Sequence, residues 1–139
     1  ENGRDRLILC LQFMVELFEY LEITFSDFQE NPMLIAKSCL NGDISVDVFS
    51  ERSSCYLEGV FNDEHSQSEI KLWKRKLARC LLSVNQQLDV EEINLLLDWL
   101  YECLNMYYLY KNQMMMYEKA IEFHKIFLAN HYTSKRSVG

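Results

Sequence analysis

The scarcity of turn-forming residues is the feature that most restricts how this 139-residue chain can fold. It holds four glycines and one proline, well below the roughly 12% that an average protein contains. Sheets of short strands need a turn every few residues, and turns depend on glycine and proline. Hydrophobic residues nevertheless make up 49% of the chain, enough for a packed core. The sequence therefore predicts one all-α domain over 1–139, a compact bundle of five to seven helices.

Two of these helices are expected to lie at the centre of the bundle. The segments 5–28 and 89–111 each confine their polar residues to one narrow stripe at helical spacing. A helix with such a narrow stripe has to be covered around most of its circumference. We therefore predict that both helices are largely buried. The core residues expected from these patterns include Phe13, Leu17, Trp73, Leu96, Trp99 and Leu100.

Start and stop signals define a short helix after the first one. Asn31 is a suitable N-cap, and the proline that follows it suits the first helical position. This helix is expected over 32–40, and Gly42 favours its end. The next segment, 43–65, has a weaker pattern and predicts one or two short helices. A functional loop is most expected there, because loops carry many binding residues.

Two capping boxes predict the starts of later helices. In the segments 66–69 and 89–92, a serine or aspartate is followed three residues later by glutamate. In this motif each side chain satisfies a free backbone N–H group at the helix start. The first box opens a helix that is expected to run to about Leu88. The second opens the second central helix.

A bend is expected near residues 111–113, although no glycine or proline marks it. One unbroken helix over 89–131 would be about 64 Å long at 1.5 Å per residue. A domain of this size measures about 30 Å across. The helical pattern becomes clear again over 117–128, and the terminal residues 132–139 are expected to fray.

A basic patch has two interpretations. It is a solvated helix face that balances acidic neighbours elsewhere in the fold, or it docks an acidic peptide or nucleic acid. The formal net charge of −7 argues against a whole-surface nucleic-acid binder, because that binding depends on neutralising phosphates. We favour the first interpretation and keep nucleic-acid association as the alternative. The patch consists of Lys71, Lys74, Arg75, Lys76 and Arg79.

Catalytic and metal-binding patterns do not stand out in the sequence. No histidine lies three or four residues from another histidine or a cysteine, whereas zinc sites cluster these residues. The glycines are isolated, so no loop is suited to cradle a phosphate or present a nucleophile. Five cysteines without a close pair predict reduced, mostly buried thiols. We therefore expect no enzyme, metal or cofactor, and interpret His124 as a packed, hydrogen-bonded histidine.

Some large apolar residues are not explained by the expected core. Two leucines fall on the polar side of the helix that is expected over 66–88, and the run 106–117 holds four tyrosines and four methionines. Methionine adapts to the shape of a partner, and tyrosine is enriched at interfaces. For the run, burial in the core and contact with a partner stay equally open. The predicted partner-binding residues are Leu72, Leu82, Tyr110, Met114 and Met115.

One short segment resembles a known repeat. Residues 117–128, from Tyr117 to Leu128, are similar to the second helix of a tetratricopeptide repeat. The resemblance implies a helical hairpin in a protein-binding solenoid. It covers twelve residues, and the roughly 34-residue period of such repeats does not recur. The chain is therefore not assigned to that family.

By elimination, the sequence predicts a protein–protein interaction module, a scaffold or adaptor that holds a helix or peptide in an apolar groove. The partner is another protein or a second copy of the chain. No stretch reaches the roughly 18 uninterrupted apolar residues of a membrane span. The chain begins without methionine and without a signal-peptide pattern. We therefore expect a domain of a longer intracellular protein, in the cytoplasm or nucleus.

Overall fold

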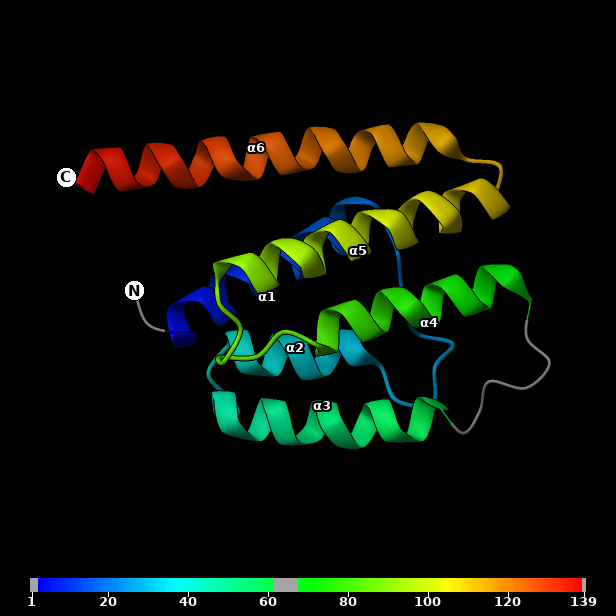
Figure 1. Ribbon diagram of the computed structural model, residues 1–139, viewed down its shortest axis with the longest axis horizontal. Coiled ribbons are helices and arrows are strands. Elements are labelled where there is room, and N and C mark those ends of the chain that lie inside the picture. Colours follow the sequence, from blue (N-terminus) through cyan, green and yellow to red (C-terminus); the bar gives the residue numbers. More distant parts are fainter. Residues whose placement is uncertain (1–2, 62–67, 139) are drawn as a thin grey trace.

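The computed structural model describes residues 3–61 and 68–138, apart from the side chains of residues 60, 61 and 131–138. Within these residues it consists of six α-helices and no strand, which confirms the predicted fold class (Figure 1). The helices are α1 (Gly3–Tyr20), α2 (Pro32–Leu40), α3 (Val46–Phe61), α4 (Glu69–Leu82), α5 (Val90–Tyr110) and α6 (Met114–Val138).

The helices are arranged around α1. The long helices α5 and α6 form an antiparallel hairpin on one side of the molecule, α2 and α4 lie beneath α5, and α3 lies on the far side (Figure 1). Helix α4 packs most extensively against α5, whereas α1 contacts α2, α4 and α6. The first predicted central helix therefore has neighbours on several sides.

Two of the predicted helix starts are confirmed. The Asn31 side chain accepts a hydrogen bond from the backbone N–H of Met33 at 3.0 Å, with proline at the first helical position. In the second capping box, Asp89 accepts from the Glu92 N–H at 2.8 Å and Glu92 accepts from the Asp89 N–H at 3.2 Å. Both starts depend on side chains close in sequence, which explains why the sequence reveals them.

The start of α4 differs from the prediction. The expected cap, Ser66, lies outside the described residues. The helix begins at Glu69, and the hydroxyl of Ser68 accepts a hydrogen bond from the Lys71 N–H at 3.3 Å. The helix ends at Leu82, with Ser83 as its C-cap, and not at residue 88 as predicted. The six residues to 88 form turns that lead into α5.

Helix α1 ends at Tyr20, so the predicted helix over 5–28 is too long. The N–H of Ile23 donates to the carbonyl of Phe18 at 2.9 Å, and the N–H of Glu22 donates to that of Glu19 at 3.1 Å. This pair of bonds is the Schellman motif, in which the first of the two donor residues takes the left-handed conformation. Here that residue is Glu22, with φ of 57°. Because glutamate seldom takes this conformation, no sequence signal announced the end.

The same motif ends α2 and α5, at two places where the sequence predicted that a helix would end. Gly42, with φ of 81°, follows α2, and Asn112, with φ of 56°, follows α5. Glycine and asparagine are the usual residues at this position. The bend at 111–113 is therefore confirmed. The segment 43–65 contains a single helix, α3, in its described part.

Burial differs between the two predicted central helices. Along α1, buried apolar residues recur from Leu7 to Phe18, whereas in α5 the buried residues begin only at Leu100. Val90 and Leu95 are 59% and 68% exposed. Three expected core residues are half-buried rather than buried: Trp73, Leu96 and Trp99.

The remaining sequence expectations concern thiols and the C-terminus. Four cysteines are buried and Cys55 is exposed. The buried thiols of Cys80 and Cys103 face each other across the α4–α5 interface, and burial raises the pKa of Cys80. Helix α6 runs to Val138, and the fraying of 132–139 stays a prediction.

Candidate functional site

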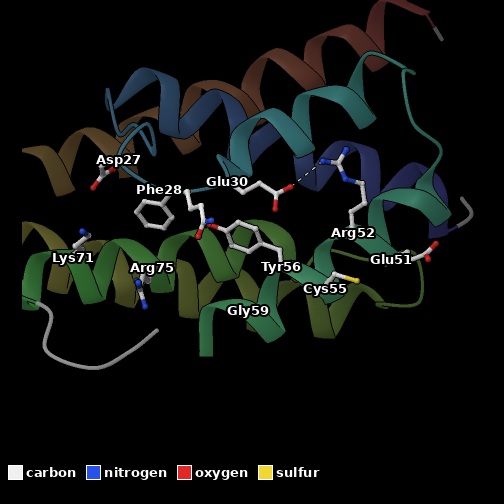
Figure 2. A pocket seen from close by; sticks show the side chains of 11 residues that line it. Asp27, Phe28, Glu30, Glu51, Arg52, Cys55, Tyr56, Gly59, Lys71 and Arg75 are labelled. Atoms are coloured by element: carbon white, nitrogen blue, oxygen red, sulfur yellow. Dashed lines mark hydrogen bonds and ion pairs between the residues drawn. The ribbon is translucent and has the colours of Figure 1, made fainter. Parts of the chain in front are cut away.

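A cavity of about 710 Å³, here called the charged cleft, opens between the 21–31 connection, α3 and α4. Figure 2 shows the Tyr56 side chain in the middle of the cleft, with Lys71 and Arg75 of α4 along one side. The other side chains come from residues 27–30 and from α3. The walls of the cleft are therefore α3, α4 and the 21–31 connection.

Several charged side chains in and beside the cleft form ion pairs with one another. The Arg52 guanidinium lies 3.2 Å from the Glu30 carboxylate, and the Lys74 ammonium lies 3.0 Å from the Asp27 carboxylate. The Lys74 side chain is only 15% exposed and also lies over the rings of Phe25 and Phe28. These contacts connect α4 and α3 to the 21–31 connection.

The protonation states in the cleft follow from these neighbours. Burial and the negative charge of Glu30 raise the pKa of Tyr56 to about 12, although Arg75 acts in the opposite direction. Burial alone would raise the pKa of Asp27, but the Lys74 hydrogen bond and the Lys74 charge lower it. At neutral pH the phenol is therefore neutral and the carboxylate is charged.

The formal charges of the cleft cancel. Three carboxylates and three cationic side chains line it, so it offers no net charge to a small ion. Neither Tyr56 nor Asp27 has the pKa near neutrality that suits a general acid or base. The charged residues that line the cleft are Asp27, Glu30, Glu51, Arg52, Lys71 and Arg75.

The structure divides the predicted basic patch among different surroundings. Lys71 and Arg75 line the cleft, and Lys74 pairs with Asp27. The Lys76 ammonium lies 4.7 Å from the centre of the Trp73 ring, and Arg79 is exposed. Contacts of this kind agree with a helix face that balances acidic neighbours, the first of the two interpretations.

A second hollow, the apolar groove, lies at the open end of the α5–α6 hairpin, away from the turn that joins the two helices. It has a volume of about 220 Å³ and lies between α1, the start of α5 and the C-terminal half of α6. Each helix contributes residues at helical spacing. The groove is lined by Arg6, Leu9, Cys10 and Phe13 of α1, by Val90, Ile93, Asn94 and Leu97 of α5, and by His124, Phe127 and Leu128 of α6.

Aromatic contacts hold the floor of the apolar groove in place. The ring centre of Phe13 lies 5.1 Å from that of Phe127 and 5.0 Å from that of His124. His124 also stacks on Tyr101 and shares a hydrogen bond with its hydroxyl, which links α6 to α5. Burial lowers the pKa of His124, so the ring is neutral at pH 7. The prediction of a packed, hydrogen-bonded histidine is confirmed.

The upper edges of the groove are apolar and open. Leu9 is 39% exposed, Val90 is 59% exposed and Leu128 is 56% exposed. The thiol of Cys10 lies at the floor, and burial raises its pKa to about 12. Arg6 is the charged side chain among the lining residues, and its guanidinium donates to the carbonyl of Leu88 at 3.3 Å; the other lining residues carry no charge at neutral pH.

The predicted partner-binding residues do not form one surface. Tyr110, Met114 and Met115 gather at the α5–α6 turn and are exposed, Met115 at 76%. Leu72 is half-buried on α4. Leu82 is 3% exposed, so its predicted place on an exposed face is wrong. The helix ends at Leu82, and this end lies among core residues on more than one side, because Leu81 and Val84 are also buried.

Of the groove residues, the sequence pattern predicts Phe13 as a core residue and places Asn94 on the polar stripe of its helix. In α5 the groove residues follow the spacing Val90, Ile93, Asn94 and Leu97, which is typical of any buried helix face. The sequence does show that most of the circumference of α5 is apolar, and this apolar surface is larger than its neighbours cover. The sequence could not locate the uncovered part, because that depends on where α4 and α6 lie.

Comparisons with protein-family models, with curated proteins and with solved structures find no match for this chain. Among the described residues, no three or more His, Cys, Asp or Glu side chains group in a way that could hold a metal ion. None of the helices in that part of the chain has the length and hydropathy needed to cross a membrane. Function has therefore to be inferred from the geometry of the two hollows.

Proposed function

We propose that this domain is a protein-interaction module that holds a helix of a partner protein in the apolar groove. The observation that carries the proposal is the open hollow between α1, α5 and α6, whose edges keep Leu9, Val90 and Leu128 partly exposed. Amphipathic helices bind in such grooves through apolar anchors at helical spacing. Contiguous apolar surface of this kind commonly marks a contact site.

The dimensions of the groove suit an anchoring side chain. A dry cavity of about 150 Å³ accepts a benzene molecule, so a hollow of about 220 Å³ has room for one large apolar side chain. Pockets that bind small organic ligands usually have a volume of at least about 300 Å³. The size therefore favours a macromolecular partner that inserts one side chain and covers the open edges with the rest of a helix.

The alternative of nucleic-acid binding through the basic patch has less support. Lys74 is paired with Asp27, and Lys76 lies over Trp73. Affinity for nucleic acid depends on cations that are available to phosphates and falls steeply with salt. Binding of an uncharged apolar helix in the groove should change little with salt, whereas binding of nucleic acid to the patch should fall steeply.

The test uses a labelled amphipathic peptide of about 18 residues, five helical turns, with leucines on one face and glutamines on the other. Fluorescence anisotropy measures its binding to the full chain. Leu128→Asp and Val90→Asp each place a charge at the groove edge, on side chains exposed enough for the fold to tolerate it. Each should weaken binding by about tenfold or more, as truncation of an interface anchor does.

Two matched variants serve as controls. Leu95→Asp changes an equally exposed α5 leucine that does not line the groove, and it should leave the affinity nearly unchanged. Met115→Asp tests the exposed turn of the α5–α6 hairpin. If Met115→Asp abolishes peptide binding while the groove variants retain it, the binding surface is the turn. If the peptide does not bind, the proposed function is wrong.

A further inference from the structure

The edge of the apolar groove that belongs to α5 carries only negative charge. Three acidic residues of α5 come directly after residues that line the groove or lie beside it: Glu91, Asp98 and Glu102. They lie on the solvent-facing side of the helix. All three are exposed, and none makes an ion pair with a described residue. Helix α5 contains no lysine or arginine. Among the described side chains, this edge is therefore an acidic stripe without a paired cation, about 16 Å long at 1.5 Å per residue.

The opposite edge, on α6, is different. There Lys125 follows the groove residue His124, and Glu118 and Glu122 lie on the preceding turns. All three are exposed, so this edge has both signs of charge. A helix lying in the groove would therefore meet strong negative charge along one flank only.

We propose, resting on the proposed function, that the occupant is an amphipathic helix of another protein whose flank towards α5 is basic. Asp98 lies four residues before Glu102 and seven residues after Glu91, so lysines or arginines with the same spacings could pair with them. Complementary charge of this kind steers association and sets the orientation of the partner. The apolar anchor in the groove supplies the affinity.

A second copy of the chain fits this site poorly. Its formal net charge is −7 at pH 7, and a symmetric pair would bring two acidic α5 edges together. Its own basic helix, α4, packs extensively against α5 and the core, so its apolar face is not available to enter another groove. The charge pattern therefore favours a different protein.

The experiment compares two labelled peptides with the same leucine face and length, one with lysines and one with glutamates along one flank. The lysine peptide should bind the full chain about tenfold more tightly than the glutamate peptide at about 50 mM salt, and the ratio should shrink at about 500 mM. Asp98→Lys combined with Glu102→Lys should remove or reverse this preference. The control, Asp43→Lys combined with Glu58→Lys, makes the same change in net charge at exposed positions away from the groove, and it should keep the preference.

The outcomes separate this proposal from the proposed function. Equal binding of the two charged peptides, with loss of both in Leu128→Asp, would leave groove binding in place and overturn the basic partner. Loss of the preference in the control variant would overturn it too, because net charge would then be the cause. A lysine peptide that binds Leu128→Asp as tightly as the unchanged chain would contradict both proposals. Absence of binding by every peptide would also contradict both.

Discussion

Helices α1 and α5 have similar apolar patterns but different surroundings. In α1, buried residues recur on every turn from Leu7 to Phe18, although Leu9 is 39% exposed. In α5, burial begins at Leu100, and the first half keeps Leu95 68% exposed. The difference teaches that a narrow polar stripe indicates how much cover a helix favours. It does not indicate which neighbour supplies that cover.

The cause lies in the lengths and positions of the neighbouring helices. Helix α1 has α2, α4 and α6 around it, whereas α5 packs against α4 and α6. The start of α5 extends past the end of α4, and the connection 83–89 passes there instead of a helix (Figure 1). The uncovered first half of α5 is the part that forms the apolar groove.

The largest effect is expected from a charge placed in each half of α5. Leu104→Asp puts a carboxylate into a fully buried site, and the chain should lose more than about 4 kcal/mol and unfold. Leu95→Asp should change the free energy of unfolding by no more than about 0.5 kcal/mol. Urea melts followed by circular dichroism measure both. Similar losses in the two variants would mean that the two halves are equally covered.

Aromatic truncations compare α1 with α5 directly. Phe18→Ala removes a fully buried ring from α1 and should cost about 3–5 kcal/mol. Trp99 is half-buried, so Trp99→Ala should cost about 1–3 kcal/mol, less than the 3–5 kcal/mol of a core tryptophan. Thermal melts with calorimetry give the two values. Equal costs would restore the buried second helix that the sequence predicts.

Loss of the N-cap should matter most where packing is thin. Asp89→Ala removes the side chain that accepts from the Glu92 N–H at the exposed start of α5, and keeps the backbone N–H that donates to Glu92; it should cost about 1 kcal/mol. Amide hydrogen exchange should then speed up over the first turns of α5, before Leu100, and stay unchanged in α1. Uniform acceleration across both helices would show that the first half of α5 does not open separately.

The smallest effect concerns His124, which links α6 to α5. Burial lowers its pKa below the ordinary value of 6.5, so the unfolded chain binds the proton more readily. Its contribution to stability is therefore complete above about pH 6.5 and is lost as the pH falls towards the folded-state pKa. His124→Gln should have a flatter stability profile between about pH 7.5 and 5.5. The other two histidines remain in both proteins, so parallel profiles would contradict this role of His124.

The features predicted correctly from the sequence depend on neighbours in the chain. Asn31 and Asp89 cap helices through N–H groups two or three residues away. Gly42 and Asn112 end helices because these residue types accept positive φ. Local chemistry of this kind is present in the sequence before any tertiary contact forms.

The features that were missed depend on tertiary contacts. Glu22 takes φ of 57° although its residue type opposes it, and Ile23 directly after it is buried in the core. Leu82 is buried although the 3.6-residue period places it on the polar side of its helix. In both cases, packing with distant segments outweighs a local preference of about 1–2 kcal/mol.

The candidate sites divide in the same way. Exposure of Tyr110, Met114 and Met115 at the turn follows from the predicted bend, because a hairpin turn of two long helices has few neighbours. The apolar groove and the pairing of Lys74 with Asp27 join segments far apart in the chain, so periodicity alone could not place them.

The sequence by itself determined the helical class and the starts of α2 and α5, since scarce glycine and local capping act within a few residues. It also determined the bend between α5 and α6, because one unbroken helix would exceed the size of the domain. Only the tertiary structure decided that buried residues recur on every turn of α1 from Leu7 to Phe18 and are absent from the first half of α5. Burial depends on where other helices end, and α4 ends at Leu82, before it can cover the start of α5. The apolar side chains left there, together with α1 and α6, form the groove.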